Sequence, residues 1–157
     1  MRLLPKLGAT LLIALLAAVG TATADKPGDK VTAGGITGAD SRMGGEAQSG
    51  PSGEDPMGQF NLRNDRGIGD VKGKVTCLKV YGNRATVEIQ INKAADPSLV
   101  GMYREMFVED NGNPDHGQPV DFIYGNDPQP TSSNCNDPFN KNVPLFHGNI
   151  QVYDAQP

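Results

Sequence analysis

The sequence predicts an all-β fold, a small antiparallel β-sandwich or barrel of about six to eight strands with one disulfide. Short segments alternate between apolar and polar residues, and clusters of Gly, Pro, Asn and Asp separate them. No segment shows a helical period over about ten residues. Two cysteines, Cys77 and Cys135, are available for the disulfide.

The strongest evidence for this fold is residues 72–92, which predict a β-hairpin. Gly82 and Asn83 form a two-residue connection with glycine first, the chemistry of a type II′ turn. This turn sets Val80 opposite Ala85, and facing residues of an antiparallel pair lie on the same side of the sheet. The hairpin therefore has one apolar face, to which the second arm contributes Ala85, Val87, Ile89 and Ile91.

The first arm of this hairpin predicts a β-bulge. Leu78 faces Val87 and belongs to the apolar face, but Val75 and Cys77 have the opposite parity. One extra residue near positions 76–78 would bring the two sets onto the same face.

Weaker patterns predict the remaining strands. The segment 101–109 is ambiguous, because apolar residues occur at both parities, and we favour a strand over a short helix since it runs into a turn. The proline- and asparagine-rich residues 125–144 predict a long loop around Cys135. Three further strands are predicted at 59–64, 120–124 and 148–154.

Residues 1–24 predict a secretory signal peptide. Arg2 and Lys6 give a basic start, residues 7–19 are apolar, and small residues precede an expected cleavage after Ala24. The apolar run is too short to span a bilayer, and we expect no transmembrane segment. The expected location is secreted, either extracellular or in the cell envelope.

The sequence after the expected cleavage divides into two parts. Residues 25–58 contain nine glycines and three prolines, so we expect a flexible leader with a short edge strand at 31–36. Residues 59–157 are expected to form the β-domain. An exported domain of this size with two cysteines is expected to pair them as Cys77–Cys135.

The net charge of the protein narrows the classes of partner that it is expected to bind. Removing Arg2 and Lys6 from the 14 basic residues leaves 12 against 18 acidic ones, a net charge of −6. Nucleic acid is therefore a poor partner. An unidentified protein or envelope component fits better, and we expect the protein to be a monomer.

The lack of known catalytic motifs favours a non-catalytic protein. The sequence contains no H-E-x-x-H, G-x-S-x-G or phosphate-binding glycine loop. The alternative is a small secreted hydrolase, in which His116 or His147 meets a carboxylate only in the fold, or two carboxylates such as Glu88 and Glu109 converge. We assign no catalytic residue and no cofactor.

One turn has oxygen-bearing side chains suited to calcium. Asp110, Asn113 and Asp115 are the candidate Ca²⁺ ligands in the segment 109–116. The spacing departs from the EF-hand pattern, and a hairpin connection explains the same residues by backbone geometry alone. We favour the hairpin connection.

One further observation concerns six short segments: 33–36, 60–62, 73–78, 82–85, 108–112 and 148–152. In this order and spacing they resemble a group of small exported bacterial proteins of unassigned function, common in actinobacteria. They are also similar to the post-COAP β-domain of some bacterial surface proteins. This resemblance implies an exported, all-β, non-catalytic module with a structural or binding role. The chain departs from it around Cys135.

Overall fold

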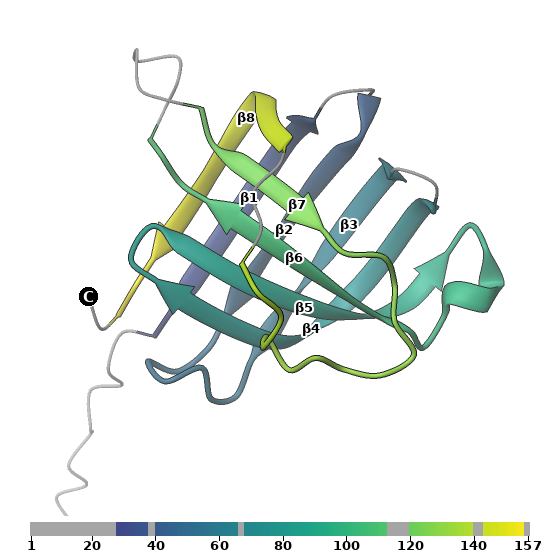
Figure 1. The fold of residues 1–157 in the computed structure, drawn as a ribbon, viewed down its shortest axis with the longest axis horizontal. Coiled ribbons are helices and arrows are strands. Elements are labelled where there is room, and N and C mark those ends of the chain that lie inside the picture. Colours follow the sequence, from purple (N-terminus) through teal and green to yellow (C-terminus); the bar gives the residue numbers. More distant parts are fainter. Residues whose placement is uncertain (1–27, 38–39, 66–67, 113–119, 140–142, 156–157) are drawn as a thin grey trace, which may run out of the picture.

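The protein folds into a closed antiparallel β-barrel of eight strands, so the predicted all-β class is confirmed and the barrel is the form it takes (Figure 1). The computed structural model describes residues 28–37, 40–65, 68–112, 120–139 and 143–155. The strands are β1 (Lys30–Thr37), β2 (Arg42–Gln48), β3 (Met57–Asp65), β4 (Gly69–Tyr81), β5 (Arg84–Ala94), β6 (Tyr103–Glu109), β7 (Phe122–Gly125) and β8 (Val143–Tyr153), with a short 3₁₀ helix, η2 (Pro97–Leu99), between β5 and β6.

The first strand closes the barrel. Every strand runs antiparallel to its neighbours in chain order, and β1 also pairs with β8, so that Val31 faces Ala47 on one side and Val152 on the other. A strand was predicted at 31–36, but its placement at an edge is wrong. Both sides of β1 are hydrogen-bonded, because closure of the barrel removes the sheet edges.

The predicted flexible leader at 25–58 is wrong where the structure describes it. β1, β2 and the start of β3 lie in this segment, so the β-domain begins at Lys30 rather than at residue 59. The glycines do not prevent folding, because strand pairing on both sides satisfies the backbone. One of them is required: a Cβ on Gly45 would lie 2.6 Å from ring atoms of Phe60.

The hairpin of β4 and β5 follows the predicted register. Tyr81 pairs with Arg84 and Val80 with Ala85, and the register shifts between Val75 and Cys77, where the bulge was predicted. The shift sets Val75 opposite Ile89 on the inner face as predicted, but Cys77 lies opposite the outward-facing Glu88, so its predicted place on the apolar face is wrong. Gly82 has φ +59°, whereas Asn83 is not among the residues with positive φ, which agrees with a type II′ turn.

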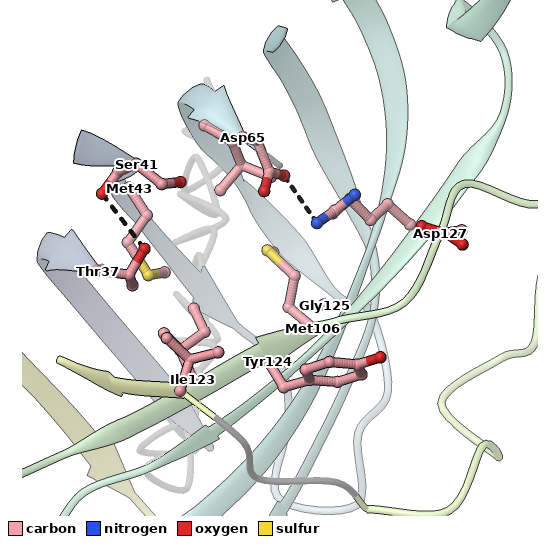
Figure 2. A pocket seen from close by; sticks show the side chains of 12 residues that line it. Thr37, Ser41, Met43, Asp65, Met106, Ile123, Tyr124, Gly125 and Asp127 are labelled. Carbon is pink, nitrogen blue, oxygen red and sulfur yellow. Dashed lines mark hydrogen bonds and ion pairs between the residues drawn. The ribbon is translucent and has the colours of Figure 1, made fainter. Parts of the chain in front are cut away.

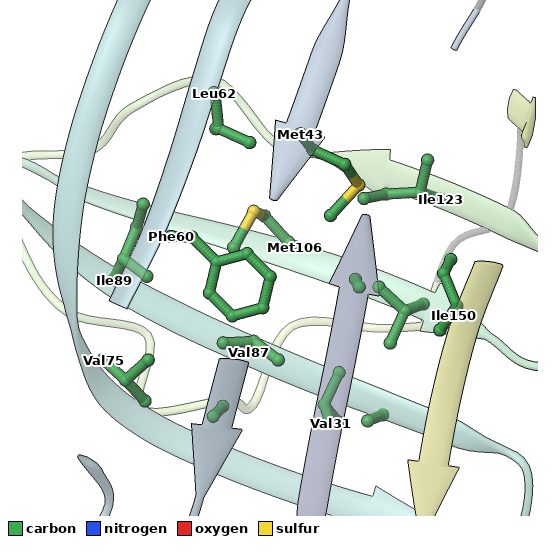
Figure 3. Packing of buried hydrophobic residues seen from close by; sticks show 14 of the residues in the cluster. Val31, Met43, Phe60, Leu62, Val75, Val87, Ile89, Met106, Ile123 and Ile150 are labelled. Atoms are coloured by element: carbon green, nitrogen blue, oxygen red, sulfur yellow. The ribbon is translucent and has the colours of Figure 1, made fainter. Parts of the chain in front are cut away.

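The barrel interior is filled by the alternate side chains of its strands. Figure 3 shows the ring of Phe60, which is fully buried, among Val31, Val87, Ile89 and Met106 from three other strands. An eight-stranded barrel is just wide enough either to be filled in this way or to hold one small ligand. The packing therefore leaves room for a ligand only towards an end of the barrel.

β6 is buried on both faces. Met106 and Val108 belong to the barrel core, while Glu105 and Phe107 face outward and are also buried. This double burial explains why apolar residues occur at both parities of the segment, which a half-buried strand does not show.

The outer cover of β6 is residues 126–139, which we call the strap. Figure 1 shows it passing in front of β4, β5 and β6 after β7 ends. The disulfide Cys77–Cys135, with Cα atoms 6.0 Å apart, ties it to β4, and Phe139 packs edge-on against Phe107 at 5.7 Å between ring centroids. The predicted disulfide is confirmed. The predicted loop ends earlier than expected, since β8 begins at Val143.

Candidate ligand-binding site

A hollow of about 240 Å³ lies at the end of the barrel where β1 ends and β2 begins, which we call the mouth. Figure 2 shows side chains of β1, β2, β3, β6 and β7 converging on it. Its floor is apolar and its rim is polar, the usual composition of a small-molecule site. The floor consists of Met43, Leu62, Met106, Ile123 and Val143, and the rim includes Thr37, Ser41, Asp65, Arg104 and Asp127.

The mouth contains an arginine that points into the barrel. Arg104 pairs with the inward-facing Ile89, and paired residues lie on the same side of a sheet. Its Nη2 lies 2.7 Å from Asp65 Oδ2 in an ion pair whose two side chains are 7% and 12% exposed, drawn as a dashed line in Figure 2. Burial lowers the pKa of Arg104, and the charges of Asp65 and Asp127 oppose that shift.

The ion pair leaves one donor of Arg104 unused. The buried Nε–H has no hydrogen-bond acceptor in the part of the chain that the structure describes. The guanidinium passes over Gly125, where a Cβ would lie 2.8 Å from Nη2 and 3.1 Å from Nε. Buried N–H groups are nearly always hydrogen-bonded in proteins, so this donor calls for an acceptor from outside the chain, either water or a ligand.

A second hollow, of about 370 Å³, is more open and lies on the outer surface between β3 and the ends of β4 and β5. Four of its nine described lining residues are charged, Arg63, Asp70, Lys72 and Lys93, and all of these except Lys72 are exposed. Such a surface keeps ligands in contact with water. We therefore take the mouth, although it is smaller, as the candidate site.

A buried carboxylate holds the strap against the barrel. Glu88 is 1% exposed although it faces outward from β5. Its Oε1 accepts from Ser132 Oγ at 2.6 Å and Thr76 Oγ1 at 3.0 Å, and its Oε2 accepts from the backbone N–H of Ser133 at 2.7 Å and of Asn134 at 3.2 Å. The strap thus wraps its own donors around a charge supplied by the sheet.

Glu105 lies beside Glu88 under the strap. The pKa of Glu105 is raised to about 7: burial is the largest cause, Asp137 and the charge of Glu88 also raise it, and a hydrogen bond from Ser133 lowers it. The Ser133 hydroxyl lies 2.9 Å from Glu105 and 3.0 Å from Glu88, but it has one proton to donate. A proton on Glu105 relieves this competition.

The candidate hydrolase residues do not come together among the described residues. His147 is exposed on β8 and does not line the mouth, and His116 lies outside the described residues. Glu109 pairs with Arg84 at 2.8 Å, whereas Glu88 lies opposite Glu105. The carboxylates that converge are therefore Glu88 and Glu105, and the strap covers them.

The calcium candidates are only partly described. Asp110 Oδ1 accepts from the N–H of Gly112 at 2.9 Å, and its Oδ2 accepts from the N–H of Val152 at 3.0 Å. Asn113 and Asp115 lie outside the described residues. No group of three or more His, Cys, Asp or Glu in the described part could hold a metal ion. Calcium binding stays a prediction.

Asp121 is another buried carboxylate in a structural position. Its Oδ2 accepts from the N–H of Ile150 at 2.7 Å and its Oδ1 from the N–H of Asn111 at 2.8 Å. These bonds join β8 to the residues flanking β7. Burial raises the pKa of Asp121, and the two backbone hydrogen bonds oppose that rise.

Sequence reasoning missed Arg104, although a signal was present. Met102, Met106 and Val108 share one parity in the ambiguous segment, and Arg104 interrupts that series. A charged residue on the apolar face of a strand indicates a buried ion pair or a site. The partner Asp65 gives no such signal, because it lies after the alternating part of its strand.

The chain matches no protein-family model, no curated protein and no solved structure. The resemblance to exported actinobacterial proteins and the post-COAP domain therefore stays a prediction. The signal peptide at 1–24 and its cleavage after Ala24 lie outside the described residues. Within the described residues, no helix has the length and apolar character needed to cross a bilayer.

Proposed function

We propose that this protein is a secreted, non-catalytic binding module that takes a small molecule in the mouth of its barrel. It would act at or outside the cell envelope. The observation that supports this most is Arg104, a buried guanidinium placed beside a hollow and left with a free donor. The disulfide is in keeping with an oxidising compartment.

Stability alone does not explain an arginine at this position. Taking a guanidinium out of water is costly, and replacing a buried ion pair with well-packed apolar side chains is often neutral or stabilising. Its neighbours on the inner faces of β5 and β6, Ile89 and Met106, are apolar and buried. An arginine kept in this position, next to a space it does not fill, is better explained by binding than by packing.

The size of the hollow limits the ligand. An apolar cavity of about 150 Å³ holds one benzene ring, so the mouth has room for about ten non-hydrogen atoms. Ligand sites for drug-sized molecules are larger, beginning at about 300 Å³. The ligand is therefore a small metabolite or one end of a longer molecule. A partner protein or envelope component could present such an end.

The proposal is tested by screening a fragment library against the ¹⁵N-labelled protein and following amide shifts. We expect hits that shift Gly125, Met106 and other residues of the mouth. The variant Val143→Trp fills the mouth and should abolish these shifts. The matched control Val100→Trp places the same side chain at a position that is 50% exposed and should leave them unchanged. A screen in which no fragment moves the mouth residues would contradict the proposal.

A further inference from the structure

We infer that the ligand of the mouth is a small neutral molecule whose carbonyl oxygen accepts a hydrogen bond from Arg104 and whose apolar body rests on the floor. This inference depends on the proposed function, because it names the chemistry of the same site. It rests on three features of the mouth: the unused donor, the balance of charges and the composition of the floor.

The unused donor calls for an acceptor. The Nε–H of Arg104 has no acceptor among the described residues, while Nη2 of the same group is held by Asp65. A ligand oxygen at this position would complete the hydrogen bonding of the guanidinium without displacing the ion pair. A water molecule would serve the same donor, so the test must show that an organic carbonyl competes with it.

The charges select a neutral acceptor over an anion. Among the described residues, one cation, Arg104, and two carboxylates, Asp65 and Asp127, line the mouth, so the formal charge of this set is −1. Asp65 already neutralises the guanidinium at 2.7 Å. An anionic ligand would meet a net negative site and be repelled by it. A neutral carbonyl gains the hydrogen bond and avoids that repulsion.

The charges of the mouth also disfavour a simple cationic ligand. A cation would be drawn to Asp127, which is exposed at the rim, but it would lie beside the guanidinium and offer no acceptor to Nε. Two like charges within one small hollow repel each other. A cation would therefore remain at the rim and leave the floor unused.

The floor adds a requirement for an apolar body. Met43, Leu62, Met106, Ile123 and Val143 form it, and two of these five are methionines. Methionine is flexible and adapts to the shape of a ligand, so the floor accepts a ring or a short branched chain. Small amides, lactams, lactones and ketones of about ten non-hydrogen atoms combine such a body with the required oxygen.

Three probes of nearly equal shape test this chemistry: cyclohexanecarboxamide, cyclohexanecarboxylate and protonated cyclohexylmethylamine. Each is titrated into the ¹⁵N-labelled protein at pH 7, and the Nε–H signal of Arg104 and the amide signal of Gly125 are followed. We expect the amide to bind and to shift the Arg104 Nε–H signal downfield. We expect the carboxylate and the amine to bind at least about tenfold more weakly, because each carries a charge that a like charge in the mouth repels.

A variant separates the hydrogen bond from the shape of the mouth. The double substitution Arg104→Met with Asp65→Asn removes the ion pair without leaving a charge buried alone, and circular dichroism reports whether the barrel is retained. We expect the amide to bind about tenfold more weakly to this variant, the loss of one hydrogen bond to a charged donor. If the variant does not fold, the comparison of the three probes on the unaltered protein decides the question by itself.

The outcomes distinguish the two proposals. Carboxylate binding as tight as that of the amide, or amide binding without a shift at Arg104, overturns the inferred ligand class and leaves the binding module standing. The same holds if none of the three probes binds while other fragments occupy the mouth. If no fragment of any charge shifts the mouth residues, the binding module itself is refuted.

Discussion

Replacing Glu88 with alanine is expected to detach the strap from the barrel and to destabilise the protein. The carboxylate is the common acceptor for the side chains of Thr76 and Ser132 and for the backbone N–H groups of Ser133 and Asn134. Its removal takes this acceptor from the Ser132 hydroxyl and the N–H of Ser133. The Thr76 hydroxyl keeps the backbone oxygen of Glu88 at 3.3 Å, and the N–H of Asn134 keeps Ser132 Oγ at 3.1 Å. The disulfide at Cys135 then keeps the strap close to the sheet but does not supply the missing acceptor.

The magnitude follows from these bonds. A hydrogen bond to a charged group contributes about 1.5–3 kcal/mol, and each buried donor left without an acceptor costs about 1–3 kcal/mol. The strap can relax so that water reaches part of it, which limits the total. We therefore expect the free energy of unfolding to fall by about 3–4 kcal/mol for Glu88→Ala. Glu88→Gln keeps the volume and one acceptor oxygen, so it should cost about half as much.

Equilibrium unfolding in urea at pH 7, followed by far-ultraviolet circular dichroism, measures these changes. Glu46→Ala is the matched control, because Glu46 is exposed on the outer face of β2; it should change stability by less than about 0.5 kcal/mol. Hydrogen exchange adds a local measurement, with faster exchange expected at the amides of Ser133 and Asn134. If Glu88→Ala is as stable as Glu46→Ala, the carboxylate does not hold the strap.

Four further predictions concern pH, packing, the disulfide and calcium. The folded protein keeps a proton on Glu105 up to about pH 7, whereas the unfolded chain releases it near 4.5, so stability should fall as pH rises between these values. Glu105→Gln should make the fall in the free energy of unfolding smaller by about 1–2 kcal/mol, allowing for screening by solvent. If the variant shows the same difference in melting temperature between pH 5 and pH 8 as the original protein, this prediction is wrong. Gly45→Ala should destabilise by about 2–3 kcal/mol because its Cβ meets the ring of Phe60, whereas Gly44→Ala, with no atom within 4 Å, should be nearly neutral in urea unfolding. Reducing the disulfide should lower the unfolding free energy by up to about 4 kcal/mol, and an unchanged urea midpoint under reducing conditions would argue against this. Asp110→Ala should lower the free energy of unfolding by about 1–2 kcal/mol in any buffer, since two backbone N–H groups lose their acceptor. A melting temperature that millimolar calcium raises in the original protein but not in this variant would support the calcium site, and no rise would end that hypothesis.

The sequence alone determined the local features of the sheet. The register of β4 and β5, the turn at Gly82 and the bulge before Leu78 depend on neighbouring residues and on a period of two, which a single strand pair expresses. The all-β class follows from the same pattern. The pairing of Cys77 with Cys135 could be predicted because two cysteines in one small domain leave one arrangement.

Only the tertiary structure decided which strands close the barrel and which segment covers its outer face. Beyond a short strand at 31–36, the glycine-rich residues of β1 and β2 have too few apolar side chains to predict their place in the sheet. That place is decided by the pairing of β1 with β2 and with β8, which is far away in the sequence. The outward face of β5 has the polar pattern of a solvated surface, yet the strap buries Glu88 there. The mouth likewise depends on Arg104 and Asp65, which come together only when the barrel is closed. Alternation reports which face a side chain takes, but long-range pairing decides which faces meet water.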